Sequence, residues 1–142
     1  MLDQKVIDLS EHRFNKAQSL LKQAEYLLKN QMYDGSINRS YYAIFNAIRS
    51  LLSLAKLESK KHSGTLALFD RYFVKTAIFD KRFSEIAHTA FDSRQDFDYD
   101  DFVIPTEPEA LSQFQNAQQL ISEVEQKRAK LINGDLSLPK VP

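Results

Sequence analysis

Apolar residues near the beginning of the chain recur with the spacing of a helix. Between residues 14 and 28 they follow one another at steps of three and four, which places them on one face of an α-helix. The residues on this face are Phe14, Ala17, Leu20, Leu21, Ala24, Leu27 and Leu28. We expect Ser10 to cap the beginning of this helix, and Asp34 to cap the next one after a break near residues 30–35.

The second predicted helix, from about Ser36 to Leu57, carries two stripes of residues. The stripe of mainly large apolar side chains contains Ile37, Tyr41, Ile44, Phe45, Ile48, Leu52 and Ala55. The stripe of small side chains contains Ser40, Ala43, Ala47 and Ser50. Because small side chains let another helix approach closely, we expect this helix to lie at the centre of the fold with neighbours on two sides.

Two shorter apolar patterns follow a polar stretch. Residues 57–64 read LESKKHSG, which predicts a loop, and Ser63 is expected to cap a short third helix. The inner face of the third helix would carry Leu66, Phe69, Tyr72 and Phe73. After a turn near residues 78–81, a fourth helix would place Phe83, Ile86, Ala87, Ala90 and Phe91 inside.

The last segment has the clearest helix-start signal. Pro105 and Pro108 interrupt the chain, and Thr106 followed three residues later by Glu109 is the pattern of a capping box. A long helix would follow, with Ala110, Phe114, Ala117, Ile121 and Val124 on its buried face. We expect Gly134 to end this helix.

Together these patterns predict an all-α protein. We expect an up-and-down four-helix bundle with a short extra helix over residues 1–132, followed by a loose C-terminal tail over residues 133–142. Residues 101–104, DFVI, are the one stretch that could be extended, and they are short and bounded by Pro105.

Composition narrows the classes of function. The chain has 142 residues, which predicts one domain, and its formal net charge of zero argues against strong non-specific attraction to nucleic acid or anionic lipid. The absence of cysteine excludes disulfides, thiol catalysis and zinc–thiolate sites. No apolar run is long enough to span a membrane and the N-terminus does not resemble a signal peptide, so we expect a cytoplasmic protein without a membrane partner.

The stretch SRQDFDYDDF, residues 93–102, contains the most informative polar residue. Arg94 continues the inner stripe of the fourth helix, so its guanidinium is expected on the apolar face. There it needs a carboxylate or a ligand, because a buried charge without a partner is unfavourable. Asp98, one turn later, can form a helix-closing ion pair with Arg94, and the alternative is a buried or interfacial site arginine.

The aspartates of this stretch also suggest calcium. Asp96, Asp98 and Asp100 alternate and Glu107 follows, which partly matches an EF-hand loop. However, Asp101 stands where that loop needs glycine. A solvated acidic loop is the alternative that we favour, so we predict no metal site and no cofactor.

Two other polar positions are candidates for ligand binding. Arg39 lies beside the small-residue stripe of the second helix, where it can line a cleft or a dimer interface or remain at the surface. His62 follows Lys60 and Lys61 at the beginning of a helix, which is a possible phosphate site, although a solvated loop is the favoured interpretation. No histidine pair has metal-ligand spacing, and no nucleotide-binding or hydrolase motif occurs.

Three segments together resemble the HEPN domain family. They are INRSYYAIFNAIRSLL, KKHSGTLALFDRYFVKT and FDSRQDFDYDDFV, and they occur in the family's order. The resemblance covers roughly residues 10 to 130, and it is strongest to small stand-alone prokaryotic members, many of which are encoded beside minimal nucleotidyltransferases. It implies a helical bundle that forms a homodimer.

The resemblance also implies a site. Several members are ribonuclease toxins in which an R-x4–6-H motif binds RNA phosphate through the arginine and transfers protons through the histidine. Arg94 corresponds to the motif arginine, but the positions five to seven residues later are Tyr99, Asp100 and Asp101, with no histidine. The site residues that we predict are therefore Arg94 with Asp98 and Tyr99, and Arg39 and His62 as further ligand contacts.

These observations leave three hypotheses for function. The first is a non-catalytic subunit of a HEPN–nucleotidyltransferase module, similar to a toxin–antitoxin pair, that binds a nucleotide, RNA or a partner segment. The second is a metal-independent ribonuclease toxin whose site departs from the R-x4–6-H motif. The third is a structural adaptor bundle. From the residues alone nothing identifies an enzyme.

Overall fold

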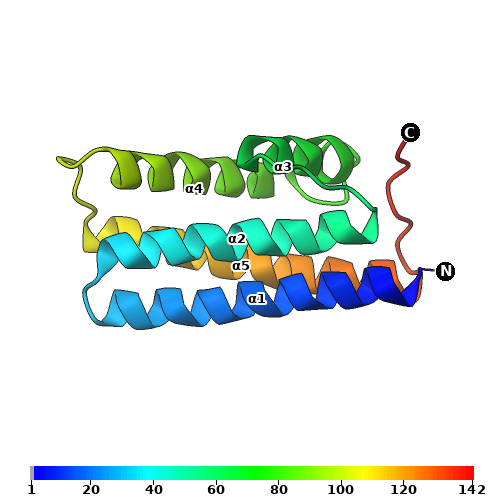
Figure 1. Ribbon diagram of the computed structural model, residues 1–142, viewed down its shortest axis with the longest axis horizontal. Coiled ribbons are helices and arrows are strands. Elements are labelled where there is room, and N and C mark those ends of the chain that lie inside the picture. Colours follow the sequence, from blue (N-terminus) through cyan, green and yellow to red (C-terminus); the bar gives the residue numbers. More distant parts are fainter. Residues whose placement is uncertain (1) are drawn as a thin grey trace.

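The central feature of the fold is a helix that is covered on several sides. The computed structural model describes residues 2–142, and its elements are α1 (Gln4–Lys29), α2 (Tyr33–Leu54), α3 (His62–Phe69), the π-helical turn η1 (Asp70–Val74), α4 (Lys81–Tyr99) and α5 (Glu107–Asn133). In Figure 1, α1, α2, α4 and α5 run alongside one another, and the short α3 lies beside one end of α4. No strand occurs in residues 2–142, so the predicted all-α bundle of four main helices with a short extra helix is confirmed.

Helix α2 occupies the centre, as its two stripes predicted. It contacts α1, α3, α4 and α5, and 15 of its 22 residues are buried. Ala43 and Ala47 are fully buried, and their small side chains allow neighbouring helices to approach closely. Both ends of α2 differ slightly from the predicted range of Ser36 to Leu57, because the helix begins at Tyr33 and ends at Leu54.

The predicted cap at Ser10 is wrong. Helix α1 begins at Gln4, and the carboxylate of Asp3 caps it by accepting a hydrogen bond from the backbone N–H of Lys5 at 3.0 Å. Ser10 is instead buried inside α1, where its hydroxyl donates to the backbone carbonyl of Ser50 at 2.7 Å. A serine on an inner helix face therefore gave the same local signal as a cap.

The other predicted caps had mixed outcomes. Asp34 lies within the first turn of α2, and Ser63 lies within the first turn of α3, so neither is the N-cap residue. The capping box of Thr106 and Glu109 is confirmed, with the N–H of Glu109 3.3 Å from Oγ1 of Thr106. Gly134 ends α5 as predicted, and its φ of 90° lies in the left-handed region that glycine adopts without strain.

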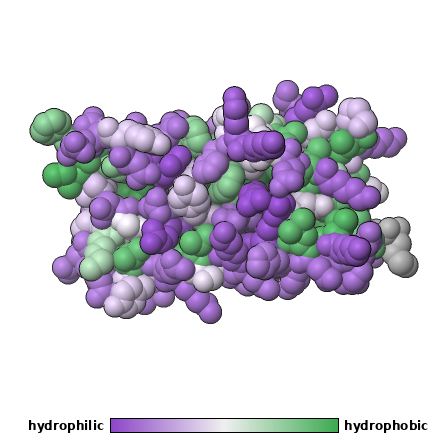
Figure 2. Space-filling view, in the orientation of Figure 1, coloured by the Kyte–Doolittle hydropathy of each residue, from purple (hydrophilic) through white to green (hydrophobic). Residues whose placement is uncertain are grey.

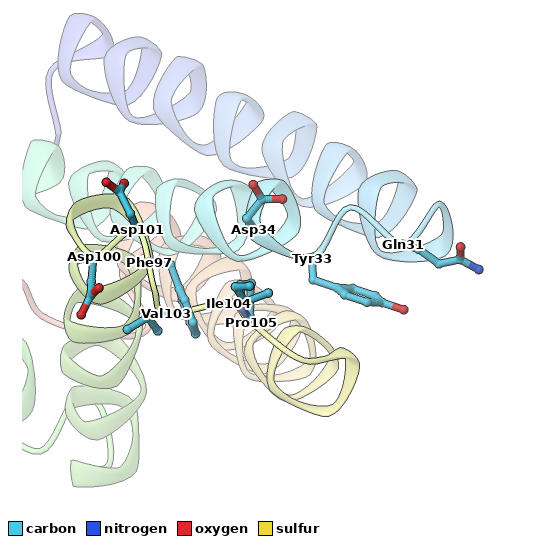
Figure 3. Close-up of a pocket in the computed structure, with 9 residues that line it drawn as sticks. All are labelled: Gln31, Tyr33, Asp34, Phe97, Asp100, Asp101, Val103, Ile104 and Pro105. Carbon is cyan, nitrogen blue, oxygen red and sulfur yellow. The ribbon is translucent and has the colours of Figure 1, made fainter.

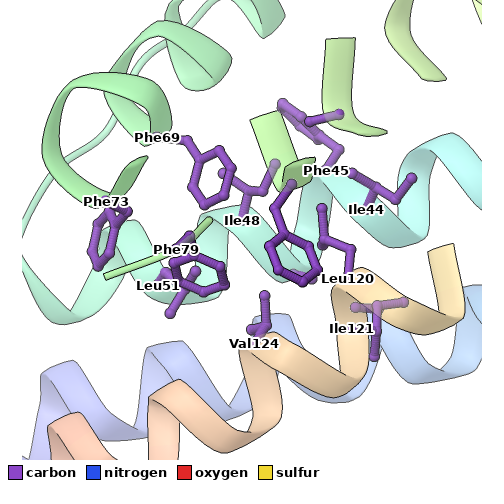
Figure 4. Close-up of a cluster of buried hydrophobic side chains, with 14 of the residues drawn as sticks. Ile44, Phe45, Ile48, Leu51, Phe69, Phe73, Phe79, Leu120, Ile121 and Val124 are labelled. Carbon is purple, nitrogen blue, oxygen red and sulfur yellow. The ribbon is translucent and has the colours of Figure 1, made fainter. Parts of the chain in front are cut away.

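Aromatic side chains fasten α3, η1 and α4 to the rest of the bundle (Figure 4). Phe79 is fully buried in the turn before α4, and its ring centroid lies 5.3 Å from that of Phe69 and 5.8 Å from that of Phe83. Such edge-to-face pairs stabilise a core beyond the area that they bury. After α5 the chain has no regular structure, and Leu136 and Leu138 pack against the core.

A buried arginine joins the first and last helices. The side chain of Arg128 on α5 is 7% exposed, and its Nε donates to Oγ of Ser10 at 2.9 Å. Its Nη2 lies 3.3 Å from a carboxylate oxygen of Glu11, and its guanidinium lies over the ring of Phe14 at 5.0 Å. Its Nε, its Nη2 and the face of its guanidinium therefore each have a partner within the bundle.

Replacing this arginine tests the link between α1 and α5. We expect Arg128→Ala to lower the free energy of unfolding by about 2 kcal/mol, because it removes a charge-assisted hydrogen bond and the packing on Phe14. Urea unfolding followed by circular dichroism measures the change. Lys130→Ala, at an exposed position of the same helix, is the control and should change little. An equal loss in both variants would contradict this role.

Candidate functional site

Arg94 points into the protein, as the spacing of α4 predicted. Its side chain is 11% exposed, and its guanidinium lies over the ring of Tyr41 at 4.9 Å and near the ring of Tyr42 at 5.8 Å. Nη1 lies 3.3 Å from Oδ2 of Asp98, so the predicted ion pair forms. The buried Nε has no hydrogen-bond partner, so this arginine is only partly satisfied by the fold.

His62 comes from the beginning of α3 and lies in the same aromatic cluster. Its ring stacks on that of Phe45, with centroids 4.2 Å apart, and its Nδ1 is 2.7 Å from the hydroxyl oxygen of Tyr41. The preferred interpretation of His62 as a residue of a solvated loop is therefore wrong. Tyr41 connects the two candidate groups, because its ring faces Arg94 and its hydroxyl contacts His62.

The electrostatic environment keeps the imidazole neutral at neutral pH. The pKa of His62 is lowered by burial, and then by the positive charges of Arg94 and Arg49. Burial raises the pKa of Tyr41, an effect that Arg94 partly opposes. Both groups are thus uncharged near pH 7. The hydrogen bond between them can form with the Tyr41 hydroxyl donating to Nδ1 of His62, or with Nδ1–H donating to the hydroxyl oxygen.

Sequence reasoning missed Arg49 and Phe45 as members of this site. The guanidinium of Arg49 lies 5.8 Å from the ring centroid of Phe45, and its Nη2 is 3.6 Å from a carboxylate oxygen of Glu58. Burial lowers the pKa of Arg49, as does the neighbouring Arg13, while Glu58 raises it. A signal was present in the sequence, because Tyr42, Phe45 and Arg49 follow one another at steps of three and four on one face of α2.

The structure does not bring the other two predicted ligand residues to Arg94. Arg39 faces α1, where its Nε donates to the side-chain oxygen of Gln23 at 3.1 Å, and it lines a separate groove with Lys22 and Tyr26. Tyr99 ends α4 with 78% of its surface exposed, and its ring stacks on none of the rings around Arg94.

The EF-hand alternative is excluded by the length of α4. This helix continues to Tyr99, so Asp96 and Asp98 lie within a helix instead of in a calcium-binding loop. In residues 2–142 no group of three or more histidine, aspartate or glutamate side chains is arranged to hold a metal ion. Across the same residues, no helix has both the length and the apolar character that crossing a membrane requires.

Comparison with known proteins identifies the family of the chain. The sequence signature described as the HEPN domain matches residues 10–127. The chain belongs to the HEPN domain family.

Three curated members illustrate the HEPN similarity. A "UPF0332 protein" of Thermotoga maritima is 38% identical over 93 residues, which cover 66% of this chain and 70% of that protein. "Putative toxin MJ0605" of Methanocaldococcus jannaschii is 29% identical over 82% of this chain and 86% of its own length. "Putative toxin MJ0142" of the same organism is 36% identical over 90 residues, 63% of this chain, and the match spans only 61% of that protein.

The correspondence of Arg94 to the motif arginine, which the resemblance implied, stays a prediction. The motif histidine would lie on the segment after it, where this chain has no histidine. In space, however, His62 from another helix lies beside the same arginine, connected to it through Tyr41. The site therefore contains an arginine and an imidazole, but they come from α4 and α3 rather than from one sequence motif.

Removing the charge of Arg94 tests the coupling within this cluster. We expect Arg94→Met to raise the pKa of His62 toward its ordinary value, because one of the charges that disfavour the imidazolium is lost. Two-dimensional NMR of the histidine ring protons against pH measures this shift. His12 and His88 lie outside the cluster and serve as internal controls. An unchanged titration of His62 would mean that the two groups do not interact.

Proposed function

We propose that this HEPN protein binds the phosphate of RNA or of a nucleotide at Arg94 and acts as a binding subunit without cleaving the ligand. The observation that carries the proposal is the state of Arg94. Its guanidinium is held against the rings of Tyr41 and Tyr42, and its buried Nε–H has no acceptor. A buried donor without a partner indicates that the fold alone does not account for this arginine.

The surroundings of Arg94 suit a phosphorylated aromatic ligand. A guanidinium supported by aromatic rings presents its N–H groups to phosphate in a fixed plane. The single contact with Asp98, at 3.3 Å, is longer than a typical charge-assisted hydrogen bond, so a phosphate can compete with that carboxylate for the guanidinium. Tyr42 is partly exposed and offers a ring on which a base can stack. The loop before α3 adds the exposed Lys60 and Lys61.

The proposed setting of this subunit is a two-component module. The resemblance to small stand-alone HEPN proteins supports a homodimer that associates with a separate minimal nucleotidyltransferase in the cytoplasm. The names of two relatives, each a "Putative toxin", agree with a toxin–antitoxin type of module. The missing motif histidine supports a binding role for this chain over a catalytic one.

Binding measurements on one variant test the proposal. Wild-type protein should bind a fluorescein-labelled single-stranded RNA in a fluorescence anisotropy titration, with ATP tested as a competitor. Arg94→Met should weaken binding at least tenfold, because a charge-assisted contact contributes about 1.5–3 kcal/mol. Arg71→Met, an exposed arginine over Tyr72, is the matched control. If neither RNA nor ATP binds, the adaptor hypothesis replaces this one.

A second candidate function, metal-independent ribonuclease activity, is favoured by the position of His62. When Nδ1–H donates to the hydroxyl oxygen of Tyr41, Nε2 keeps a free lone pair. That nitrogen can accept the proton of an RNA 2′-hydroxyl, whose oxygen bonds to phosphorus while the bond from phosphorus to the 5′-oxygen breaks. Arg94 would stabilise the charge on the phosphate, and water would protonate the departing 5′-oxygen.

An assay in EDTA separates the two candidates. If the chain is a ribonuclease, purified protein should produce 2′,3′-cyclic phosphate ends, and His62→Gln should slow cleavage by about 100-fold because a positioned base is lost. His88→Gln, at a histidine outside the cluster, is the control. Intact RNA after incubation with wild-type protein would exclude this candidate and leave the binding proposal standing.

A further inference from the structure

The loop that connects α4 and α5 exposes large apolar side chains. Phe102 is 95% exposed, Ile104 is 79% exposed, and Tyr99 at the end of α4 is 78% exposed. Figure 2 shows apolar atoms at the left edge of the molecule, where α4 ends in the same view of Figure 1. Contiguous exposed apolar groups are typical of a surface that another molecule covers.

A hollow of about 410 Å³ lies beside this loop (Figure 3). The beginning of α2 provides one side through Tyr33 and Asp34, and the other side comes from the end of α4 and the loop. Phe97 and Ile104 contribute apolar surface, while Asp34, Asp100 and Asp101 contribute carboxylates. No lysine or arginine lines the hollow.

This end of the molecule is negatively charged although the whole chain is neutral. Residues 92–109 include seven aspartates and glutamates and one basic residue, Arg94, which already pairs with Asp98. The hydroxyl of Tyr33 donates to a carboxylate oxygen of Glu107 at 3.3 Å. Desolvation raises the pKa of Tyr33, and the neighbouring carboxylate of Glu107 raises it further.

We propose that this surface is a docking site for a partner protein that places an arginine or lysine side chain in the hollow. The carboxylates would balance the partner's charge, and the rings of Tyr33 and Phe97 would pack against its aliphatic stem. Phe102 would enter an apolar pocket of the partner as an anchor. The site is separate from the phosphate site proposed above and does not depend on it.

The negative charge of this surface favours a basic partner protein over nucleic acid or an anionic membrane. Phosphates of nucleic acid and anionic lipid headgroups would be repelled by Asp34, Asp100 and Asp101. A protein with a basic, partly apolar face complements both properties of the surface.

A peptide library displayed on phage, with twelve random residues per peptide, tests the proposal on the full chain. We expect enriched peptides to combine arginine or lysine with apolar residues. A fluorescein-labelled copy of the most enriched peptide should bind wild-type protein more weakly as salt increases. Its affinity should fall at least tenfold for Phe102→Ser and for the double variant Asp34→Asn, Asp101→Asn.

Two matched controls make the result specific. Tyr26→Ser removes another exposed ring, which is 67% exposed on α1, and Asp135→Asn removes an exposed carboxylate outside the hollow. Both should bind the peptide like wild type, and melting temperatures should show that all variants fold.

Four outcomes would overturn the proposal. Two concern the peptides: the enriched peptides lack a cationic residue, or wild type and the Phe102→Ser variant bind the peptide equally. The other two concern different occupants: the chain dimerises in sedimentation experiments and Phe102→Ser abolishes the dimer, or wild-type protein floats with phosphatidylcholine vesicles. The last two would assign the surface to a second copy or to a lipid bilayer. RNA binding by the Phe102→Ser variant is measured in parallel. Unchanged RNA binding would show that a loss of peptide binding concerns only the docking surface and not the phosphate site.

Discussion

The close packing of α2 is the constraint on which the rest of the structure depends. Ala43 and Ala47 are fully buried, so neighbouring helices approach the backbone of α2 from several directions. The larger residues on its remaining face, Tyr41, Tyr42 and Phe45, then meet α3 and α4 together. The candidate site lies where these elements converge, so its geometry follows from the packing of the centre.

Arg128 and Arg94 are both supported by an aromatic ring, but their hydrogen bonds are satisfied to different extents. Arg128 lies over an aromatic ring, and its Nε donates to Ser10. Arg94 also lies over an aromatic ring and contacts one carboxylate, but its Nε has no acceptor. Arg128 therefore shows how this fold satisfies a structural arginine. Arg94 departs from that pattern, which is the physical reason to assign it a ligand.

Periodicity was sufficient to predict the helices and the inward direction of Arg94, because both depend on spacing along one element. The local sequence did not show which other element each polar side chain contacts. Ser10 has the sequence of a cap, but its hydroxyl bonds to α2. His62 was assigned to a loop because nothing local shows that α3 carries it onto Phe45 and Tyr41. Arg39 shares a helix with Tyr41, yet its guanidinium faces α1.

The net charge of the chain describes only the average over its surface. A formal charge of zero argues against electrostatic attraction to nucleic acid only when the charges are evenly mixed. Here the carboxylates gather at the end of α4 and the loop after it, while Arg94, Arg49 and the neutral His62 gather around Tyr41 and Phe45. Both proposals depend on this separation, because a phosphate is attracted to the arginines and a basic protein to the carboxylates. The distribution of charge over the surface, and not the net charge, is therefore the quantity on which both proposed binding sites depend.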